Sequence, residues 1–358
     1  MPGKDSKSSW IVRGYQIGDE QQTVPLFNTI FNKKMTEAEY LWKVVNSPWP
    51  TGTATTWVAD SRGKIAGQYA ATAMRFHLHE TEHQIVHVCD VMTHPDFRRQ
   101  GILSTIGETA HQNWAGNNVA FVTGFPHKGW GTRSHYLNWQ TMYQGIWMWR
   151  LLDAGRMLPK SLQIMAGVTS LISKASNKFY DRRLQHLSQS ISTRSISRVD
   201  EEFDTLWQKL KPHYPACVVR NAAWLRYRYL DSPHNEYYPI AAYDNRGELC
   251  GYVVCRLRNL DGKLVAYIAD LFCLPEDEAA LASLLKAAIQ EMTNKGARAL
   301  LSVIPERSFV TKHYHRAGFI KRYGSFDVSI VPFAEGLDYS ALQDPQKWYS
   351  TGGDFDII

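Results

Sequence analysis

The chain has 358 residues, of which 44% are hydrophobic and 21% charged, and its formal net charge is +6 at pH 7. This length allows two domains of ordinary size, and the composition is typical of soluble globular proteins. The mild basic excess suits a polyanionic ligand, and the absence of a long Lys/Arg run argues against nucleic acid as a partner. No apolar run reaches the roughly 18 residues of a membrane span, and Met1 to Ser9 lack the apolar core of a signal peptide. We therefore expect a cytoplasmic protein without a transmembrane segment.

The five cysteines are an odd number, and no two of them form a Cys-x-x-Cys pair. Most of them stand in apolar runs, which indicates buried free thiols in a reducing compartment. Their spacing favours neither a disulfide framework nor a zinc site, and no metal is expected. The five are Cys89, Cys217, Cys250, Cys255 and Cys273.

The first half of the chain predicts strands that lead into a basic turn and a helix. Residues 58–67 read as a strand, a glycine-containing turn and a second strand, and the apolar run from Ile85 to Val91 predicts a longer strand. Pro95 then precedes the turn Arg98-Arg99-Gln100-Gly101, and a helix-forming run extends from Leu103 to Trp114. The free N–H groups and the dipole of a helix N-terminus attract anions, and the two arginines strengthen that field. The segment therefore predicts a phosphate site.

The connector from Ala154 to Arg198 predicts a helix with two different faces. We expect it to pack across two domains, and the alternatives are a lid over a substrate tunnel or a surface for an acidic carrier or a membrane. The apolar residues at helical spacing are Leu162, Met165, Val168, Leu171 and Ile172, and the basic residues opposite are Lys160, Lys174, Lys178, Arg182 and Arg183.

The second half of the chain repeats the first. Five segments recur in the same order, displaced by 179 to 185 residues, which indicates an internal duplication. Each half therefore predicts a mixed α/β sandwich in which strands alternate with helices. The matched pairs are 46–48 with 231–233, 58–67 with 242–251, 90–95 with 270–275, 125–126 with 304–305, and 138–139 with 318–319.

The turn after Pro95 resembles the pyrophosphate loop of the GNAT superfamily of acyl-CoA-dependent acyltransferases, which has the form Arg/Gln-x-x-Gly-x-Gly/Ala. Arg98 and Gly101 fill the first two fixed positions. Leu103 departs from the third, which is tolerated if its side chain points into the helix–sheet core. The element order also resembles the GNAT fold, an α/β (α+β) fold with a mixed sheet. The resemblance implies a tandem protein: an acyl-CoA-binding domain at 10–153, a helical connector at 154–198, a degenerate copy at 199–335 and a tail at 336–358.

The two halves differ at the position of this loop. After Pro275 the second half has Glu276-Asp277-Glu278, whose carboxylates satisfy the helix dipole and repel a pyrophosphate. We therefore expect only the first half to bind the cofactor. The residues that the resemblance implies for cofactor binding are Val91, Met92, Thr93, Arg98, Arg99, Gln100, Gly101, Ile102, Leu103 and Ser104.

The resemblance implies direct attack of an amine on the thioester of acetyl-CoA or a longer acyl-CoA. The acceptor would be an amine-bearing small molecule, a peptide or a glycan. A fatty acyl donor on an acyl carrier protein is an alternative. A base must deprotonate the amine, and His87 and Asp90 on the long strand are the candidates. Strand alternation predicts that they point to opposite faces. Asp270 repeats Asp90 in the other half, which favours a structural role for both.

The general acid is less clearly marked. The second half contains Tyr314 in a Tyr-x-x-x-Gly-Phe helix end, which resembles the GNAT element whose tyrosine protonates the leaving thiolate. The first half has Ser134 at that position and Tyr136 two residues later, and both are candidates. Ser134 and Leu103 also favour a second hypothesis, a non-catalytic acyl-CoA sensor or scaffold protein. Thiol release on a panel of amines separates the two.

Overall fold

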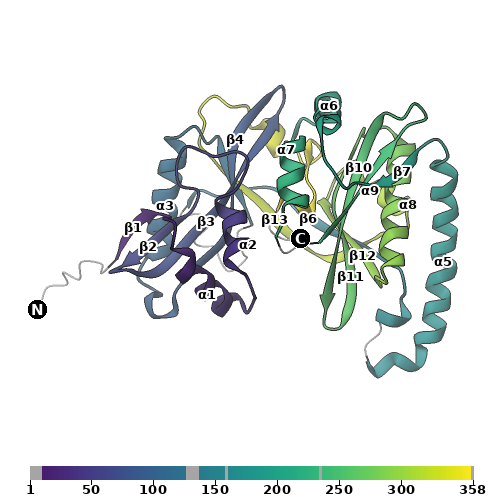
Figure 1. Ribbon diagram of the computed structural model, residues 1–358, viewed down its shortest axis with the longest axis horizontal. Coiled ribbons are helices and arrows are strands. Elements are labelled where there is room, and N and C mark those ends of the chain that lie inside the picture. Colours follow the sequence, from purple (N-terminus) through teal and green to yellow (C-terminus); the bar gives the residue numbers. More distant parts are fainter. Residues whose placement is uncertain (1–9, 126–136, 158–159, 234–235, 356–358) are drawn as a thin grey trace, which may run out of the picture. The chain divides into compact units, whose positions relative to one another are not determined.

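The computed structural model describes residues 10–125, 137–157, 160–233 and 236–355 (Figure 1). The chain forms two compact units. The N-terminal unit comprises residues 1–76, 82–142 and 327–338, and the C-terminal unit comprises residues 77–81, 143–326 and 339–358.

The N-terminal unit contains a mixed sheet with strand order β1-β2-β3-β4-β5-β13. Strands β4 and β5 are parallel, whereas β1–β2, β2–β3 and β5–β13 are antiparallel. Its elements are β1 (Ile11–Gly14), α1 (Glu20–Phe31), α2 (Glu37–Val44), β2 (Trp57–Ser61), β3 (Lys64–Leu78), β4 (Thr81–Thr93), α3 (Ile102–Ala115), β5 (Phe121–Gly124) and the C-terminal part of β13 (Ile320–Pro332).

The C-terminal unit repeats this arrangement with strand order β6-β12-β11-β10-β9-β7, in which β11–β12 is the parallel pair. Its strands are β6 (Gln140–Leu151), β7 (Ser192–Ser195), β8 (Ala216–Val218), β9 (Tyr237–Tyr243), β10 (Leu249–Leu260), β11 (Lys263–Cys273), β12 (Ala299–Pro305) and β14 (Trp348–Tyr349). Its helices are α5 (Ala166–Leu187), α6 (Glu201–Leu210), α7 (Ala222–Leu225) followed by a π-helical turn (Arg226–Leu230), α8 (Glu278–Asn294), α9 (Thr311–Arg316) and α10 (Ser340–Gln343). The mixed α/β class and the duplication are thus confirmed.

Each unit takes a strand from the other half of the sequence. In the N-terminal unit, residues 329–332 of β13 pair with β5, Ser329 opposite Gly124. In the C-terminal unit, β6 pairs with β12 from Gly145 opposite Pro305 to Leu151 opposite Ala299. The compact units are therefore discontinuous in sequence, and the domain boundaries at 153 and 199 stay a prediction about the repeat along the sequence.

The N-terminal sheet has an apolar core on each face. On one side the sheet packs against α3, whose buried residues include Ile102, Ile106 and Trp114. On the other side it packs against α1 and α2, where Phe27 and Tyr40 are buried. The helices are held by burial of these apolar faces, as expected for a layered α/β fold.

The α3 core also contains a buried histidine. His111 lies among Tyr69, Trp114, Trp139 and Phe333, with its Nε2 3.1 Å from the hydroxyl of Tyr69. Burial lowers the pKa of His111 to about 4. The folded protein therefore binds this proton less readily than the unfolded chain does, and stability falls as the pH drops from the unfolded pKa towards the folded one.

This histidine predicts a measurable acid sensitivity. Lowering the pH from about 7 to about 5 should cost roughly 2 kcal/mol of unfolding free energy through His111. His111→Gln keeps a polar partner for Tyr69 and should remove most of that loss, which urea denaturation at the two pH values measures. His186→Gln, at an exposed position of α5, is the matched control and should leave the loss in place. An unchanged loss in His111→Gln would assign the acid sensitivity to other groups.

The connector forms α5, which lies alongside α8 in the C-terminal unit (Figure 1). The apolar residues singled out in the sequence do not form the packing face of this helix. Val168, Leu171 and Ile172 are exposed, whereas Ser170, Ser173 and Asn177 face the protein and form hydrogen bonds. Polar contacts with the end of β6 and the following turn determine which face of the helix is inward.

Candidate functional site

The segment between β4 and α3 forms an exposed turn whose backbone favours an anion. A short 3₁₀ turn covers Pro95–Phe97, and Arg99 and Gly101 have positive φ angles of 66° and 79°. Gly101 is the N-cap of α3 and provides no side chain, so no side chain caps the first turn of this helix. The N–H groups there, the helix dipole and two exposed arginines together attract negative charge.

A hollow of about 420 Å³ adjoins this turn. It brings together nine of the ten residues expected to bind the cofactor, whereas Gln100 is exposed and outside the lining. Ile30 and Phe31, which end α1, supply an apolar wall that sequence reasoning missed, because an apolar pair at a helix end is too common a pattern to single out. The expected residues in the lining are Val91, Met92, Thr93, Arg98, Arg99, Gly101, Ile102, Leu103 and Ser104.

Leu103 fits because its side chain is half-buried against the core between α3 and the sheet. The helix approaches β3 closely at its first residue. A Cβ on Gly67 would lie 2.8 Å from Cγ2 of Ile102 and 3.1 Å from the carbonyl oxygen of Met92, so only glycine fits there. In the C-terminal unit, Gly251 lies in the same way against Phe272.

The corresponding helix of the C-terminal unit is capped by its own carboxylate. The N-cap of α8 is Asp277, and its side chain accepts a hydrogen bond from the N–H of Ala280 at 2.9 Å. Glu278 in the first turn forms an ion pair with Arg316. The expected acidic self-capping of the second copy is present in the structure, and it occupies the groups that a pyrophosphate would need.

Strands β4 and β5 pair in parallel and then separate. Val86 lies opposite Val122 and His87 opposite Thr123; β5 ends one residue later, whereas β4 continues to Thr93. His87 stands at this point of separation. Its side chain is buried, and its ring lies edge-on to Phe125 with 5.3 Å between centroids.

The predicted alternation between His87 and Asp90 is wrong because β4 contains a bulge. Asp90 has a φ of 47°. Val88 and Val91 pack on the α3 side, whereas Cys89 packs on the side of α1 and α2, and Asp90 there forms an ion pair of 2.6 Å with Lys43 of α2. Two consecutive residues thus point to one face, as happens at β-bulges, and His87 points to that face as well.

In the C-terminal unit the register of β10 and β11 also shifts, beside Asp270, the counterpart of Asp90. Asp270 is fully buried and accepts hydrogen bonds from Arg220, Tyr252 and Thr351. The repeated aspartate therefore supports a buried polar network in one unit and an ion pair in the other. This favours the structural interpretation of Asp90.

The candidates for the general acid remain unplaced. Ser134 and Tyr136 lie outside the described residues. In the other unit, Tyr314 is buried, forms a hydrogen bond of 2.8 Å with Ser302 and packs against Phe319. These contacts give Tyr314 a packing role in the C-terminal unit. Among the described residues, no cluster of three or more His, Cys, Asp or Glu side chains is arranged to hold a metal ion.

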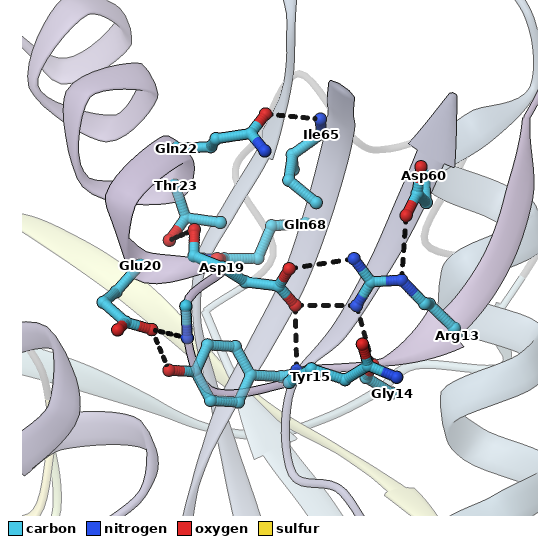
Figure 2. A network of polar contacts seen from close by, with 12 residues as sticks. Arg13, Gly14, Tyr15, Asp19, Glu20, Gln22, Thr23, Asp60, Ile65 and Gln68 are labelled. Carbon is cyan, nitrogen blue, oxygen red and sulfur yellow. Dashed lines mark hydrogen bonds and ion pairs between the residues drawn. The ribbon is translucent and has the colours of Figure 1, made fainter. Parts of the chain in front are cut away.

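A polar network fixes the start of α1, whose other end lines the hollow (Figure 2). Arg13 donates two hydrogen bonds to Asp19 and one to Asp60, and Tyr15 donates to Glu20. Burial alone would raise the pKa of Asp19, but hydrogen bonds from Arg13 and the N–H of Gln16 hold it below its usual value. The network therefore keeps α1 attached to β1 and β2 at neutral pH.

Residues 12–135 match the sequence profile of the family described as acetyltransferase (GNAT) domain. The N-terminal half of this chain carries a GNAT domain. The match includes β4, the basic turn and α3, which are the elements around the hollow. No curated protein sequence is significantly similar to the chain.

Solved structures share the fold over almost the whole chain. A GCN5-related N-acetyltransferase from Anabaena variabilis has a TM-score of 0.64 at 10% identity, over 91% of this chain and 73% of that chain. Saccharomyces cerevisiae N-myristoyltransferase with bound myristoyl-CoA has a TM-score of 0.60 at 9% identity, over 90% and 82%. A tandem GNAT protein from the clavulanic acid pathway has a TM-score of 0.56 at 12% identity, over 92% and 100%. The tandem GNAT fold is thus confirmed.

Proposed function

We propose that this protein is an N-acyltransferase that moves an acyl group from acyl-CoA to an amine by direct attack on the thioester. The observation that carries this proposal is the contrast between the two GNAT units. The start of α3 has Gly101 at positive φ, two arginines and no capping side chain, whereas the start of α8 is capped by Asp277. The C-terminal unit forms the same fold without the anion-binding features. Folding therefore does not require them, and a ligand is the best explanation for their presence in the N-terminal unit.

The N-terminal unit would hold the cofactor in two parts. The pyrophosphate lies at the N–H groups of residues 101–104 with Arg98 and Arg99 beside it. The pantetheine extends along β4 beyond its separation from β5, where the backbone of Val91 to Thr93 borders the hollow. A backbone N–H near Met92 stabilises the oxyanion that forms on the thioester carbonyl.

His87 is the proposed general base. It stands where β4 and β5 part, which is where a thioester held along β4 would meet an incoming amine. Asp90 is instead assigned to holding α2 through Lys43, because its carboxylate is engaged in that ion pair. The proton passes from the attacking nitrogen to the imidazole, the C–N bond forms and the C–S bond breaks to release coenzyme A.

Ligand analysis of the purified protein tests the proposal most directly. Mass spectrometry of freshly purified protein should detect co-purified acyl-CoA and report its chain length. Thiol release from that acyl-CoA in the presence of an amine panel should follow. Tight binding with no thiol release on any amine would favour the sensor hypothesis, and release only from an acylated carrier protein would favour the carrier-bound donor.

A further inference from the structure

The outward face of α5 is an apolar stripe. From Val168 to Phe179 its side chains stand at helical spacing, with a gap at Ala175 and Ser176, and Ile164 and Met165 continue it in the 3₁₀ turn (Lys160–Met165) before α5. The exposed fraction is 96% for Ile164, 71% for Leu171 and 65% for Phe179. Soluble monomers rarely expose a continuous apolar surface of this kind without using it for binding. The stripe consists of Ile164, Met165, Val168, Leu171, Ile172 and Phe179.

The helix cannot rotate about its axis to bury this stripe, because hydrogen bonds hold its other face against the protein. Ser170 donates to Asp153 at 2.5 Å, and Asn177 donates to the carbonyl of Leu151 at 2.9 Å. Arg150, buried at the end of β6, donates to the side chains of Asn177 and Asp181. An amphipathic helix whose polar face is inward and whose apolar face is outward is the reverse of the usual arrangement.

A basic pocket borders the stripe. It has a volume of about 460 Å³ between α5 and α8, and its charged lining has five cations and one anion, a net charge of +4. Lys174, Lys178 and Arg182 follow each other at four-residue spacing in a row beside the apolar stripe, and Lys286 faces them from α8. Within the part of the chain that the structure describes, none of these four forms an ion pair with a carboxylate.

We propose that α5 is a membrane-surface helix that docks the protein on anionic lipids. The apolar stripe enters the boundary between headgroups and acyl chains, and the basic pocket receives lipid phosphates. Apolar side chains next to a row of Lys and Arg are the combination that binds helices in the plane of an anionic bilayer.

The geometry fits a lipid surface better than a protein groove. The part of the stripe within α5, from Val168 to Phe179, covers 12 residues, roughly 18 Å of helix at 1.5 Å per residue. Lys174, Lys178 and Arg182 follow one edge of it, which is where anionic headgroups would lie when the apolar side chains enter the membrane. No described helix is long and apolar enough to cross a membrane, so α5 would lie in the surface plane.

Co-sedimentation of the full-length protein with vesicles tests the proposal. The protein should bind vesicles of phosphatidylcholine with phosphatidylglycerol and bind phosphatidylcholine alone much more weakly. The double variant Leu171→Glu/Phe179→Glu should lose more than about tenfold in vesicle affinity, because two buried apolar contacts become charged. Ile17→Glu is the matched control, since Ile17 is 90% exposed outside α5, and it should bind as the parent protein does.

A second variant tests the charge pattern. Lys178→Gln/Arg182→Gln should weaken binding to anionic vesicles by about fivefold per residue, the effect of one basic side chain near such a surface. Circular dichroism should show every variant folded, since all these side chains are exposed.

Three outcomes would overturn the proposal. The first is equal or absent binding to both kinds of vesicle. The second is saturable binding of inorganic phosphate, lost in Lys178→Gln/Arg182→Gln, without vesicle binding, which would mark a free-anion site. The third is a dimer in sedimentation velocity that Leu171→Glu/Phe179→Glu abolishes, which would mark a second copy of the chain as the occupant.

Discussion

Gly101→Asp should abolish acyl-CoA binding, with a loss of at least about 100-fold in affinity. The substitution places at the N-cap of α3 the carboxylate that Asp277 places at the N-cap of α8. The carboxylate and the pyrophosphate are both negative, and two like charges about 4 Å apart repel by several kcal/mol even at the intermediate dielectric of a protein surface. The carboxylate also accepts hydrogen bonds from the N–H groups that the pyrophosphate needs. Isothermal calorimetry with acetyl-CoA and myristoyl-CoA measures the loss.

The control for this variant separates charge from backbone strain. Gly101 has a φ of 79°, which strains residues with a side chain, although Asn and Asp tolerate it best. No atom lies within 4 Å of a Cβ built there, so the side chain itself meets open space. Gly101→Asn has the shape of the aspartate without its charge and should keep affinity within about tenfold. A similar loss in both variants would assign the effect to strain and remove the electrostatic argument for the site.

A substitution at the corresponding turn of the C-terminal unit should not change the affinity for acyl-CoA. Glu276→Ala, in the turn before α8, should leave acyl-CoA affinity unchanged in the same calorimetric experiment. A clear loss there would mean that the C-terminal unit holds the ligand.

The anion-binding turn was predictable from sequence because the duplication allows the turn after Pro95 to be compared with the turn after Pro275. The second half has Glu276-Asp277-Glu278 after its proline and neither the arginines nor the glycine, so the two copies show directly which residues the fold does not require. Strand and helix positions were also predictable, since an apolar, β-branched run from Ile85 to Val91 marks β4 and the buried residues of α3 recur at a helical period. The hollow itself needed the structure, because Ile30 and Phe31 come from a helix about 60 residues earlier in the chain.

Other features depend on contacts that no local pattern contains. Strand β13 crosses to the N-terminal unit and pairs with β5, with Ser329 opposite Gly124. Hydrophobic periodicity does not predict such long-range pairings. The bulge at Asp90 depends on a positive φ. An aspartate can adopt that conformation, but its presence in a sequence does not predict it. The orientation of α5 depends on hydrogen bonds from Ser170 and Asn177, which in this helix determine the inward face more strongly than the apolar residues do.

His87→Ala should reduce kcat by about 10²- to 10⁴-fold, the usual contribution of a positioned general base. The loss should appear in kcat with little change in KM for acyl-CoA, because His87 lies at the separation of β4 and β5 and outside the lining of the hollow. Thiol release with the best acceptor from the amine panel measures both constants. Free imidazole should restore part of the rate by entering the space left beside Phe125, which a purely structural role would not permit.

Asp90→Asn is the control for His87→Ala, because it tests the other candidate for the general base. It removes the negative charge that faces the buried Lys43, so the protein should lose about 3 to 5 kcal/mol of stability, as when other buried ion pairs are broken. Its kcat at a temperature where it remains folded should stay within about tenfold of the parent, since only His87 is asked to accept the proton. The opposite pattern, a small effect at His87 and a kcat loss of 10²-fold or more at Asp90, would transfer the role of base to the aspartate. It would also mean that the bulge in β4 serves to aim Asp90 at the amine, because the bulge is what places both side chains on one face of the strand.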